Sequence, residues 1–462
     1  MATNKALQSS VKVPGPLAQE LSMAPRRLPI LGHAVALRRT PLDFLSSLPA
    51  LGDLVKIGLG TRTAYLVCDP ELSHLVLRDS RTFDKGGPVM DTARTLLRDG
   101  MVTCPYEPHR RQRRLIQPSF NKDRLAEYAD MMPPYISAAL DSWQDGQVID
   151  VLPEMMEITS RVTARTMFTA TLDADTISEF MDCLGIVLDG LFKRVTSPLP
   201  VLMKLPTPAN RRYAQARARM DEIVQQTIEF YRRSGIQRGD LLATLLAARG
   251  EDGDRLSEQE IHDQVFTFFA AGTETTATLL AWALHVVGTQ PHIRKQLQAE
   301  VDTVLDGRPA TWADIPRLDF TYRILIETMR LYPPVVLTTR ITTADTELGG
   351  HKIANGTDVF LSPYIVHRRP EIYPDPDTFN PDRWLSQRPA PPRGAYIPFG
   401  GGSRKCIGDT FSLTEATLAL STIVNRFELH PDPKSTTQPR LSSTLRPHPL
   451  LMSLHARRDQ GR

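Results

Sequence analysis

Apolar positions return every three to four residues along most of the chain, a spacing that lets one face of a helix be buried. The longest such run starts after Ser257 and Glu260, whose three-residue spacing forms a capping box, and it continues to about Val287. Its middle is apolar on nearly every side, so we expect this helix to cross the interior. Helical patterns cover residues 122–145, 154–168, 174–193, 208–234, 258–288, 291–305, 319–331 and 409–427.

Strand patterns occupy two short regions. Residues 54–59 and 64–68 are apolar runs on either side of a turn, and they predict a β-hairpin followed by a short helix at 71–78. A second strand-rich region at 338–366 is divided by two glycine-containing turns, and residues 359–361 predict a strand. Proline-rich stretches at 198–208 and 389–398 predict long ordered loops.

These elements predict an α+β fold that is mostly α. No repeat or low-complexity linker divides the sequence, so we expect one large helical domain with a minor β-rich region over residues 25–455. A flexible tail is expected at 1–24 and a basic tail at 456–462. Within residues 1–30, no apolar run approaches the roughly 20 residues of a membrane-spanning helix. We therefore expect a soluble, cytoplasmic protein without a membrane anchor, and a monomer.

Charge and cysteine content narrow the class of protein further. The chain has 462 residues and a net charge of +3, so its composition gives no signal for nucleic-acid binding. Its four cysteines are widely spaced and lack the pairing typical of zinc sites. This pattern predicts reduced thiols rather than a disulfide framework. The cysteines are Cys68, Cys104, Cys183 and Cys406.

Cys406 has neighbours that favour chemistry. It lies in the glycine-rich segment 398–409, next to Arg404 and Lys405 and just before a predicted helix. Cations and a helix N-terminus stabilise a thiolate, so we expect Cys406 to be an anionic ligand or a nucleophile. The glycines allow the backbone to approach a flat partner closely. A buried structural cysteine is the alternative interpretation.

A charged residue interrupts the apolar middle of the longest helix. Glu274 follows Gly272 and is surrounded by threonines within 270–276. A buried carboxylate is costly unless it is paired or functional. Gly272 weakens the helix by roughly 1 kcal/mol, and threonine hydroxyls can bond to freed carbonyls. These weaknesses predict a local opening of the helix against a ligand, and a kinked core helix is the alternative.

Two motifs resemble those of the cytochrome P-450 family. The spacing Phe-x-x-Gly-x-Arg-x-Cys-x-Gly resembles its haem-binding signature, and 271–275 resembles its oxygen-binding motif. This resemblance covers about residues 25–455 and implies the family's fold and a haem-thiolate monooxygenase with haem b. It implies that Cys406 is the axial ligand of the haem iron, and that Thr275 and Glu274 are catalytic, with Glu274 relaying protons from solvent. The residues implied to contact the cofactor in these motifs are Phe399, Gly402, Arg404, Cys406, Gly408 and Ala271.

Further matches imply support for the cofactor. Glu327 and Arg330 on one helix, with Arg383 later in the chain, resemble the family's structural triad, although Asp382 stands where glutamate is commoner. Haem carries two propionates, which require cationic or hydrogen-bonding partners. By resemblance, the propionate partners are His109, Arg113, Arg340 and Arg404.

The resemblance also implies O₂ and separate redox partners, because we expect no flavin or iron–sulfur domain after residue 462. Bacterial members of this kind are served by a ferredoxin and an NAD(P)H-linked ferredoxin reductase. An acidic ferredoxin is expected to dock near Arg110, Arg111 and Lys405. For Arg110, Arg111 and Arg114, a solvated helix face is the alternative interpretation.

An apolar small molecule is the expected substrate. Segments 205–212 and 444–448 resemble those of bacterial terpene-oxidising members, which implies a cyclic sesquiterpene hydrocarbon in secondary-metabolite biosynthesis. A fatty acid or a polyketide remains an alternative. By their positions, the predicted pocket residues are Phe192, Phe266, Phe269, Ala270, Val335, Val336, Leu337 and Leu445.

Other functional classes share part of this pattern. A non-redox haem-thiolate isomerase or dehydratase needs Cys406 but neither a reductase nor Thr275. A haem-binding sensor or carrier also needs no acid–alcohol pair at 274–275. A cysteine hydrolase would require histidine and carboxylate or amide partners, and it would leave Arg404 and Gly408 unexplained.

Overall fold

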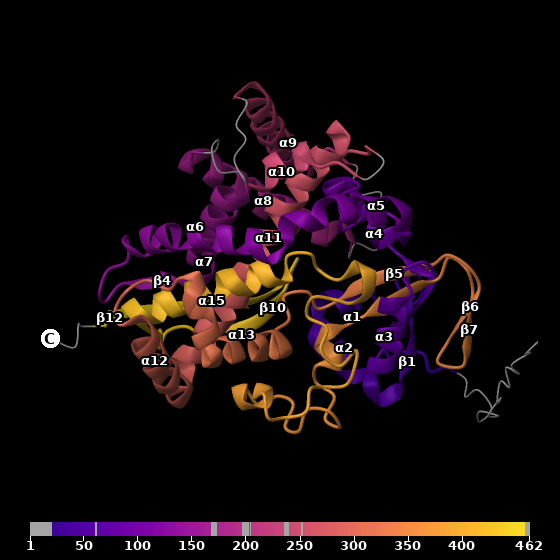
Figure 1. The fold of residues 1–462 in the computed structure, drawn as a ribbon. Helices are drawn as coiled ribbons and strands as arrows, with labels where there is room; N and C mark the ends of the chain where they lie inside the picture. The colour runs from indigo at the N-terminus through magenta and orange to yellow at the C-terminus, as the bar shows by residue number, and fades with distance from the viewer. Residues whose placement is uncertain are drawn as a thin grey trace, which may run out of the picture.

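The computed structural model describes residues 21–60, 62–167, 173–195, 203, 205–234, 240–250 and 253–457. Helices dominate it, and Figure 1 shows α8, α9 and α10 at one side of the molecule, with strands β1, β5, β6 and β7 toward another end. The main helices are α3 Pro70–Arg78, α4 Gly87–Leu97, α5 Tyr106–Ile116, α6 Lys122–Leu140, α7 Val151–Met167, α8 Ala174–Val195, α9 Pro208–Ser234, α11 Glu258–Thr289, α12 Pro291–Leu305, α13 Asp319–Leu331 and α15 Asp409–Arg426. The shorter helices are α1 Ala34–Arg39, α2 Pro41–Ser47, α10 Leu241–Ala247 and α14 Pro363–Val366.

The helix α11 crosses the core, as its apolar sequence predicts, and lies near the centre of Figure 1. The predicted capping box is present, because Glu260 N–H donates to Ser257 Oγ while Ser257 N–H donates to the Glu260 carboxylate. α11 packs against α7 on one side and α15 on another. Buried side chains lie on every face of α11, which explains why its sequence lacks a polar face.

Within the described ranges, the strands form four small sheets. The largest has the order β1-β2-β8-β5-β3 and contains the predicted hairpin, with β2 parallel to β8. The strands are β1 Leu54–Leu59, β2 Arg62–Val67, β3 Phe83–Asp84, β4 Val148–Asp150, β5 Thr338–Thr342, β6 Thr346–Leu348, β7 His351–Ile353, β8 Asp358–Leu361, β9 Phe427–Pro431, β10 Gln438–Leu441, β11 Leu445–His448 and β12 Leu451–Ala456.

Most predicted elements are found, and the differences are local. The helix predicted at 122–145 ends at Leu140, and 389–398 is an ordered loop, whereas most of 198–208 lies outside the described residues. The helices α4 and α5 and the strands after residue 426 were not predicted. The fold is nevertheless the expected α+β arrangement, dominated by helices. Among the described residues, none of the helices combines the length and apolarity needed to cross a lipid bilayer.

Parts of both predicted tails belong to the folded domain. Ala24 is buried, and its N–H donates to the Lys56 carbonyl on β1. At the other end, Ala456 is the last residue of β12, and Arg457 forms an ion pair with Asp302. Hydrogen bonds and an ion pair therefore hold the described residues of both predicted tails against the domain.

Candidate active site

A cavity of about 380 Å³ separates the loop around Cys406 from the middle of α11. Phe399, Gly400, Cys406, Ile407 and Gly408 line it on the loop side. The α11 side is formed by Ala271, Gly272, Thr275 and Thr276. The two motifs recognised in the sequence therefore face the same space, although more than 100 residues separate them in the chain.

The loop that carries Cys406 is folded tightly by backbone contacts. Cys406 N–H donates to the Phe399 carbonyl at 2.9 Å. Gly402 has a φ of 62°, and a Cβ atom there would lie 2.1 Å from the Leu77 carbonyl oxygen on α3, so only glycine fits. Gly408 differs, because a Cβ at this position would meet no protein atom within 4 Å. Its missing side chain leaves free space on the cavity side, which suits the close approach of a flat cofactor.

The electrostatic setting of Cys406 departs from the prediction. Cys406 is open to the cavity, yet desolvation by the surrounding protein raises the pKa of its thiol, and the Gly408 N–H and the charges of Arg113 and Lys405 offset this only in part. Arg404 does not pair with the thiol, because it donates to the carboxylate of Asp84. The protein environment alone thus favours the thiol, so the charge of a bound metal is what would hold Cys406 as a thiolate.

All four predicted propionate partners are buried or half-buried around this cavity. Burial, reinforced by the charges of Arg404 and Arg113, lowers the pKa of His109 to about 3, so its imidazole is neutral. Burial likewise lowers the pKa of Arg340 to about 10. Arg113 donates to the Lys405 carbonyl and so ties α5 to the Cys406 loop. All four predicted partners, with Arg404 as the fourth, line the cavity.

Two of these arginines have donors without a partner. The Nε atoms of Arg340 and Arg404 are buried and bond to none of the residues that the structure describes. A buried guanidinium with an unsatisfied N–H is costly, and an acceptor in the cavity would satisfy it. Carboxylates such as haem propionates are suitable acceptors, and the residues present therefore fit the cofactor that the sequence motifs imply.

Lys85 is a further cation at the cavity that sequence reasoning missed. It follows β3, lines the cavity, and its pKa is held well below the usual value by burial and by the charges of Arg340 and Arg404. A lone lysine after a two-residue strand gives no sequence signal. Only the pairing of β3 with β5, which also carries Arg340, brings Lys85 to this site.

The oxygen-side motif lies on an uninterrupted helix. α11 is continuous from Glu258 to Thr289, so the predicted local opening is not present. Thr275 Oγ1 donates to the Ala271 carbonyl at 2.7 Å, which is the predicted bond from a hydroxyl to the helix backbone. Thr275 lines the cavity, whereas Glu274 is buried and forms an ion pair with Arg446 on β11. The acid and the alcohol of this motif therefore face different surroundings.

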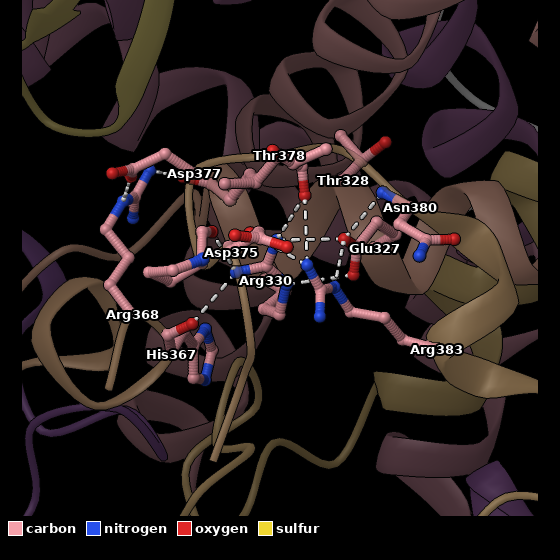
Figure 2. Close-up of polar contacts among 12 residues, drawn as sticks. Glu327, Thr328, Arg330, His367, Arg368, Asp375, Asp377, Thr378, Asn380 and Arg383 are labelled. Carbon is pink, nitrogen blue, oxygen red and sulfur yellow. Dashed lines mark hydrogen bonds and ion pairs between the residues drawn. The ribbon is translucent and has the colours of Figure 1, made fainter. Parts of the chain in front are cut away.

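The three residues of the predicted triad come together, as Figure 2 shows. Arg330 donates to both carboxylate oxygens of Glu327, at 2.9 and 2.8 Å, and Arg383 donates to one of them at 3.3 Å. Arg330 also donates to the carbonyl of His367. The His367 ring in turn accepts the Ile397 N–H at the start of the Cys406 loop. The triad thus supports the loop through His367.

The predicted substrate residues are divided between the cavity and the core. Val335 lines the cavity. Phe266 and Phe269 instead contact the ring of Phe180, and Leu445 is fully buried with its carbonyl bound to Trp282 Nε1. These three side chains, which we expected in the pocket from their positions in the sequence, therefore pack in the core instead. The others that do not line this cavity are Phe192, which is half-buried, Ala270 on α11, and Val336 and Leu337 in the core near β8.

Comparison with known proteins agrees with this geometry. A family profile described as Cytochrome P450 matches residues 23–454, and the chain therefore belongs to the cytochrome P450 family. It is an oxidoreductase of the haem-thiolate type, a class that uses O₂ and redox partners. A solved structure described as the cytochrome P450DA heme domain superposes with a TM-score of 0.85 at 31% identity, covering 95% of this chain and 98% of that chain.

Three similar proteins come from Streptomyces. Cyclooctatin synthase of Streptomyces melanosporofaciens is 46% identical, over 93% of this chain and 95% of the relative. Cyclooctat-9-en-7-ol 5-monooxygenase of the same organism is 47% identical, over 89% and 90%. Pentalenene oxygenase of Streptomyces avermitilis is 45% identical, over 94% and 97%.

Proposed function

We propose that this protein is a monooxygenase that hydroxylates a cyclic terpene hydrocarbon, with a sesquiterpene as the first choice and haem b as the cofactor. One oxygen atom of O₂ enters a C–H bond of the substrate, and the other leaves as water with two electrons and two protons. The observation that supports the proposal is the shared cavity, which both Cys406 and Thr275 line. Three relatives named for terpenoid compounds support the substrate class.

The residues of this chain have separate tasks in the reaction. Cys406 would hold the haem iron, and His109, Arg113, Arg340 and Arg404 would bind the propionates. Haem held by a thiolate supplies the activation of O₂. Thr275 offers a hydroxyl at the cavity wall on the oxygen side. The protein also orients the substrate and keeps water away from it.

The wall beside α11 is apolar and suits a hydrocarbon. Phe120 and Phe268 contact each other there, with ring centroids 5.5 Å apart. The basic side chains that line the same cavity are Lys85, His109, Arg113, Arg340, Arg404 and Lys405. Four of them are the proposed propionate partners, so the lining that remains is mainly apolar and favours a hydrocarbon over a fatty acid. The apolar residues of the wall are Met101, Val102, Phe120, Met167, Phe268, Leu279, Met329 and Val335.

A binding and turnover series tests the substrate class. The haem-loaded protein is titrated with pentalenene, cyclooctat-9-en-7-ol, a long-chain fatty acid and a macrolide. We expect a shift of the haem to high spin with the terpenoids, and a product that contains one atom from labelled O₂. A shift and a product with the fatty acid alone would overturn the terpene assignment.

A matched pair of variants locates the binding wall. Val335→Asp places a carboxylate in the apolar wall and is expected to weaken terpene binding by roughly tenfold or more. Val148→Asp is the control, because Val148 is an exposed valine on β4 that does not line the cavity. Equal effects of the two substitutions on the spin shift would contradict the assigned wall.

Electrons are proposed to come from a ferredoxin that docks beside the Cys406 loop. Arg110 and Arg114 are exposed on α5, the helix that Arg113 links to this loop. Arg111 no longer belongs to the docking set, because Asp254 and Glu260 bind its guanidinium. Lys405 stays half-exposed beside Asp409. The exposed cations therefore suit an acidic partner.

Charge reversal tests this surface. Arg110→Glu combined with Arg114→Glu is expected to slow reduction by an acidic ferredoxin roughly tenfold at low salt, with the difference shrinking as salt rises. Arg212→Glu on α9 is a control at another exposed arginine. The docking proposal is wrong if both changes slow reduction equally or if salt has no effect on the difference.

A further inference from the structure

The carboxylate of Glu274 is held by the β10–β11 hairpin, far along the chain from α11. Its Oε1 atom accepts hydrogen bonds from the hydroxyls of Ser443 and Thr444, the latter at 2.8 Å. The same oxygen accepts from Arg446 Nη2 at 2.6 Å and from Arg446 Nε at 3.2 Å. Four donors from three residues therefore converge on one oxygen atom.

The second carboxylate oxygen of Glu274 lacks such donors among the described residues. Oε2 accepts no hydrogen bond from any residue that the structure describes, although the side chain is only 5% exposed. Donors that saturate Oε1 stabilise negative charge on that atom, so a proton is taken up on Oε2. The hairpin thereby determines which oxygen of Glu274 exchanges protons.

The hairpin contains groups of two kinds around this oxygen. Arg446 keeps its charge at every relevant pH, so it can orient the carboxylate but cannot pass a proton. Ser443 and Thr444 have hydroxyls that both donate and accept. Ser443 is half-buried while Thr444 is buried, so the Ser443 hydroxyl is the one nearer to solvent.

We propose that Arg446 is a positioning residue for proton delivery, and that Ser443 forms the solvent-side end of the route through Glu274 toward Thr275. Arg446 fixes the carboxylate through Oε1 and leaves Oε2 for the proton. The hairpin itself is fixed to α11 by Trp282 Nε1, which donates to the Leu445 carbonyl at 2.7 Å. This assignment rests on the monooxygenase activity proposed above, since only O₂ activation consumes the delivered protons.

The structure offers a matched control within the same hairpin. Arg440 on β10 lies directly across from Arg446 in the strand register. Arg440 is exposed, whereas Arg446 reaches the Glu274 carboxylate. Substitution of either arginine removes one positive charge from the same hairpin, and only one of the two substitutions releases Glu274.

The test compares Arg446→Gln, Ser443→Ala and Arg440→Gln in the haem-loaded protein supplied with a ferredoxin, its reductase and NADPH. We expect Arg446→Gln to slow NADPH consumption roughly tenfold and to raise the solvent deuterium isotope effect, because proton delivery becomes limiting. Ser443→Ala should change both in the same direction by less, and Arg440→Gln should change neither. Glu274→Gln sets the full size of the effect, and adding Arg446→Gln to it should cost nothing further.

Amide hydrogen exchange gives a readout that does not depend on turnover. Arg446→Gln should speed exchange in residues 438–448, whereas Glu274→Gln should leave the hairpin protected, since an amide oxygen can still accept. Faster exchange in Arg446→Gln with an unaltered isotope effect would show a purely structural contact and overturn the proposal. Arg446→Lys covers the case in which the glutamine variant does not fold, because lysine keeps the charge but cannot make both contacts.

The two proposals fail in distinguishable ways. NADPH consumption and its isotope effect are measured with and without pentalenene. Absence of terpene oxidation in the unaltered protein would remove the substrate assignment only. Equal isotope effects in Arg446→Gln and Arg440→Gln would remove the role of Arg446 only.

Discussion

Two sets of buried arginines in this protein differ in whether their hydrogen-bond donors have partners. Arg330 is fully buried, and it donates to Glu327 and to the carbonyls of His367, Pro376 and Thr378. Arg340 and Arg404 are also buried, yet each keeps an Nε without a partner among the described residues. The first set helps to support the Cys406 loop, and the second set has donors at the cavity that lack a partner among those residues. We propose that hydrogen-bond satisfaction separates the structural arginine from the two that would receive a ligand.

This difference has an energetic meaning. A buried ion pair that makes all its hydrogen bonds is costly to break, because the remaining charge has no partner. A buried cation without an acceptor is costly as it stands, and binding an anion lowers that cost. We therefore expect substitutions in the two sets to affect the protein in different states, as the following two changes test.

The largest effect is expected for Arg330→Met. Removal of the guanidinium leaves the buried Glu327 carboxylate without its main partner, and the free energy of unfolding should fall by about 3–5 kcal/mol. Urea unfolding of the haem-free protein measures the loss. Arg369→Met is the control, because Arg369 pairs with the half-exposed Glu371 and should cost about 1 kcal/mol or less. Similar losses in both variants would contradict a structural role for the triad.

A smaller effect, which depends on the cofactor, is expected for Arg340→Met. The haem-free protein should be unchanged or slightly more stable, because a desolvated cation whose pKa burial lowers to about 10 has been removed. The haem-loaded protein should lose its haem roughly tenfold faster, since a charge-assisted bond to a propionate is missing. Transfer of haem to an acceptor protein measures this rate. Destabilisation of the haem-free protein alone would contradict the assignment.

The smallest effect is expected for Glu415→Gln, which tests a third way of burying a charged group. Glu415 on α15 is fully buried, and neither carboxylate oxygen has a partner among the described residues. Burial raises the pKa of this carboxyl well above its usual value, so folding favours the protonated form. The unaltered protein therefore loses stability as pH rises above the unfolded pKa of about 4.3, and the variant does not.

Stability measured against pH tests this sign. The advantage of Glu415→Gln should be absent near about pH 4 and should widen by about 1 kcal/mol between about pH 5 and about pH 6. Urea unfolding at each pH provides the free energies. An advantage that is the same at every pH would show that protonation of Glu415 is not involved.

The sequence was informative where local patterns carry the structure. The bounds of α11 and its capping box follow from apolar periodicity and from Ser257 with Glu260. α5 was missed because its run of arginines hides the apolar face formed by Leu115 and Ile116. The C-terminal strands were missed because they are short and pair with distant segments, as β12 does with β4. Such pairing leaves no local signal.

The residues of the site also differ in whether a local pattern in the sequence reveals them. Cys406, Glu274 and Thr275 were identified because their motifs are compact in sequence. Their partners were not, since Arg446 reaches Glu274 from 172 residues away. The raised pKa of Cys406 was also unexpected, because desolvation by the surrounding protein outweighs the neighbouring cations, and desolvation depends on the whole fold.

The apolar wall of the cavity contains three methionines, Met101, Met167 and Met329. Methionine side chains are unbranched and polarisable, so they change shape around a bound group at little energetic cost. A wall of this kind accommodates ring skeletons of different outline before any residue is replaced. Gene duplication could then begin from an enzyme that already accepts several hydrocarbons, and later substitutions would narrow its range. The same tolerance makes these three positions the natural sites for laboratory selection of new terpene products.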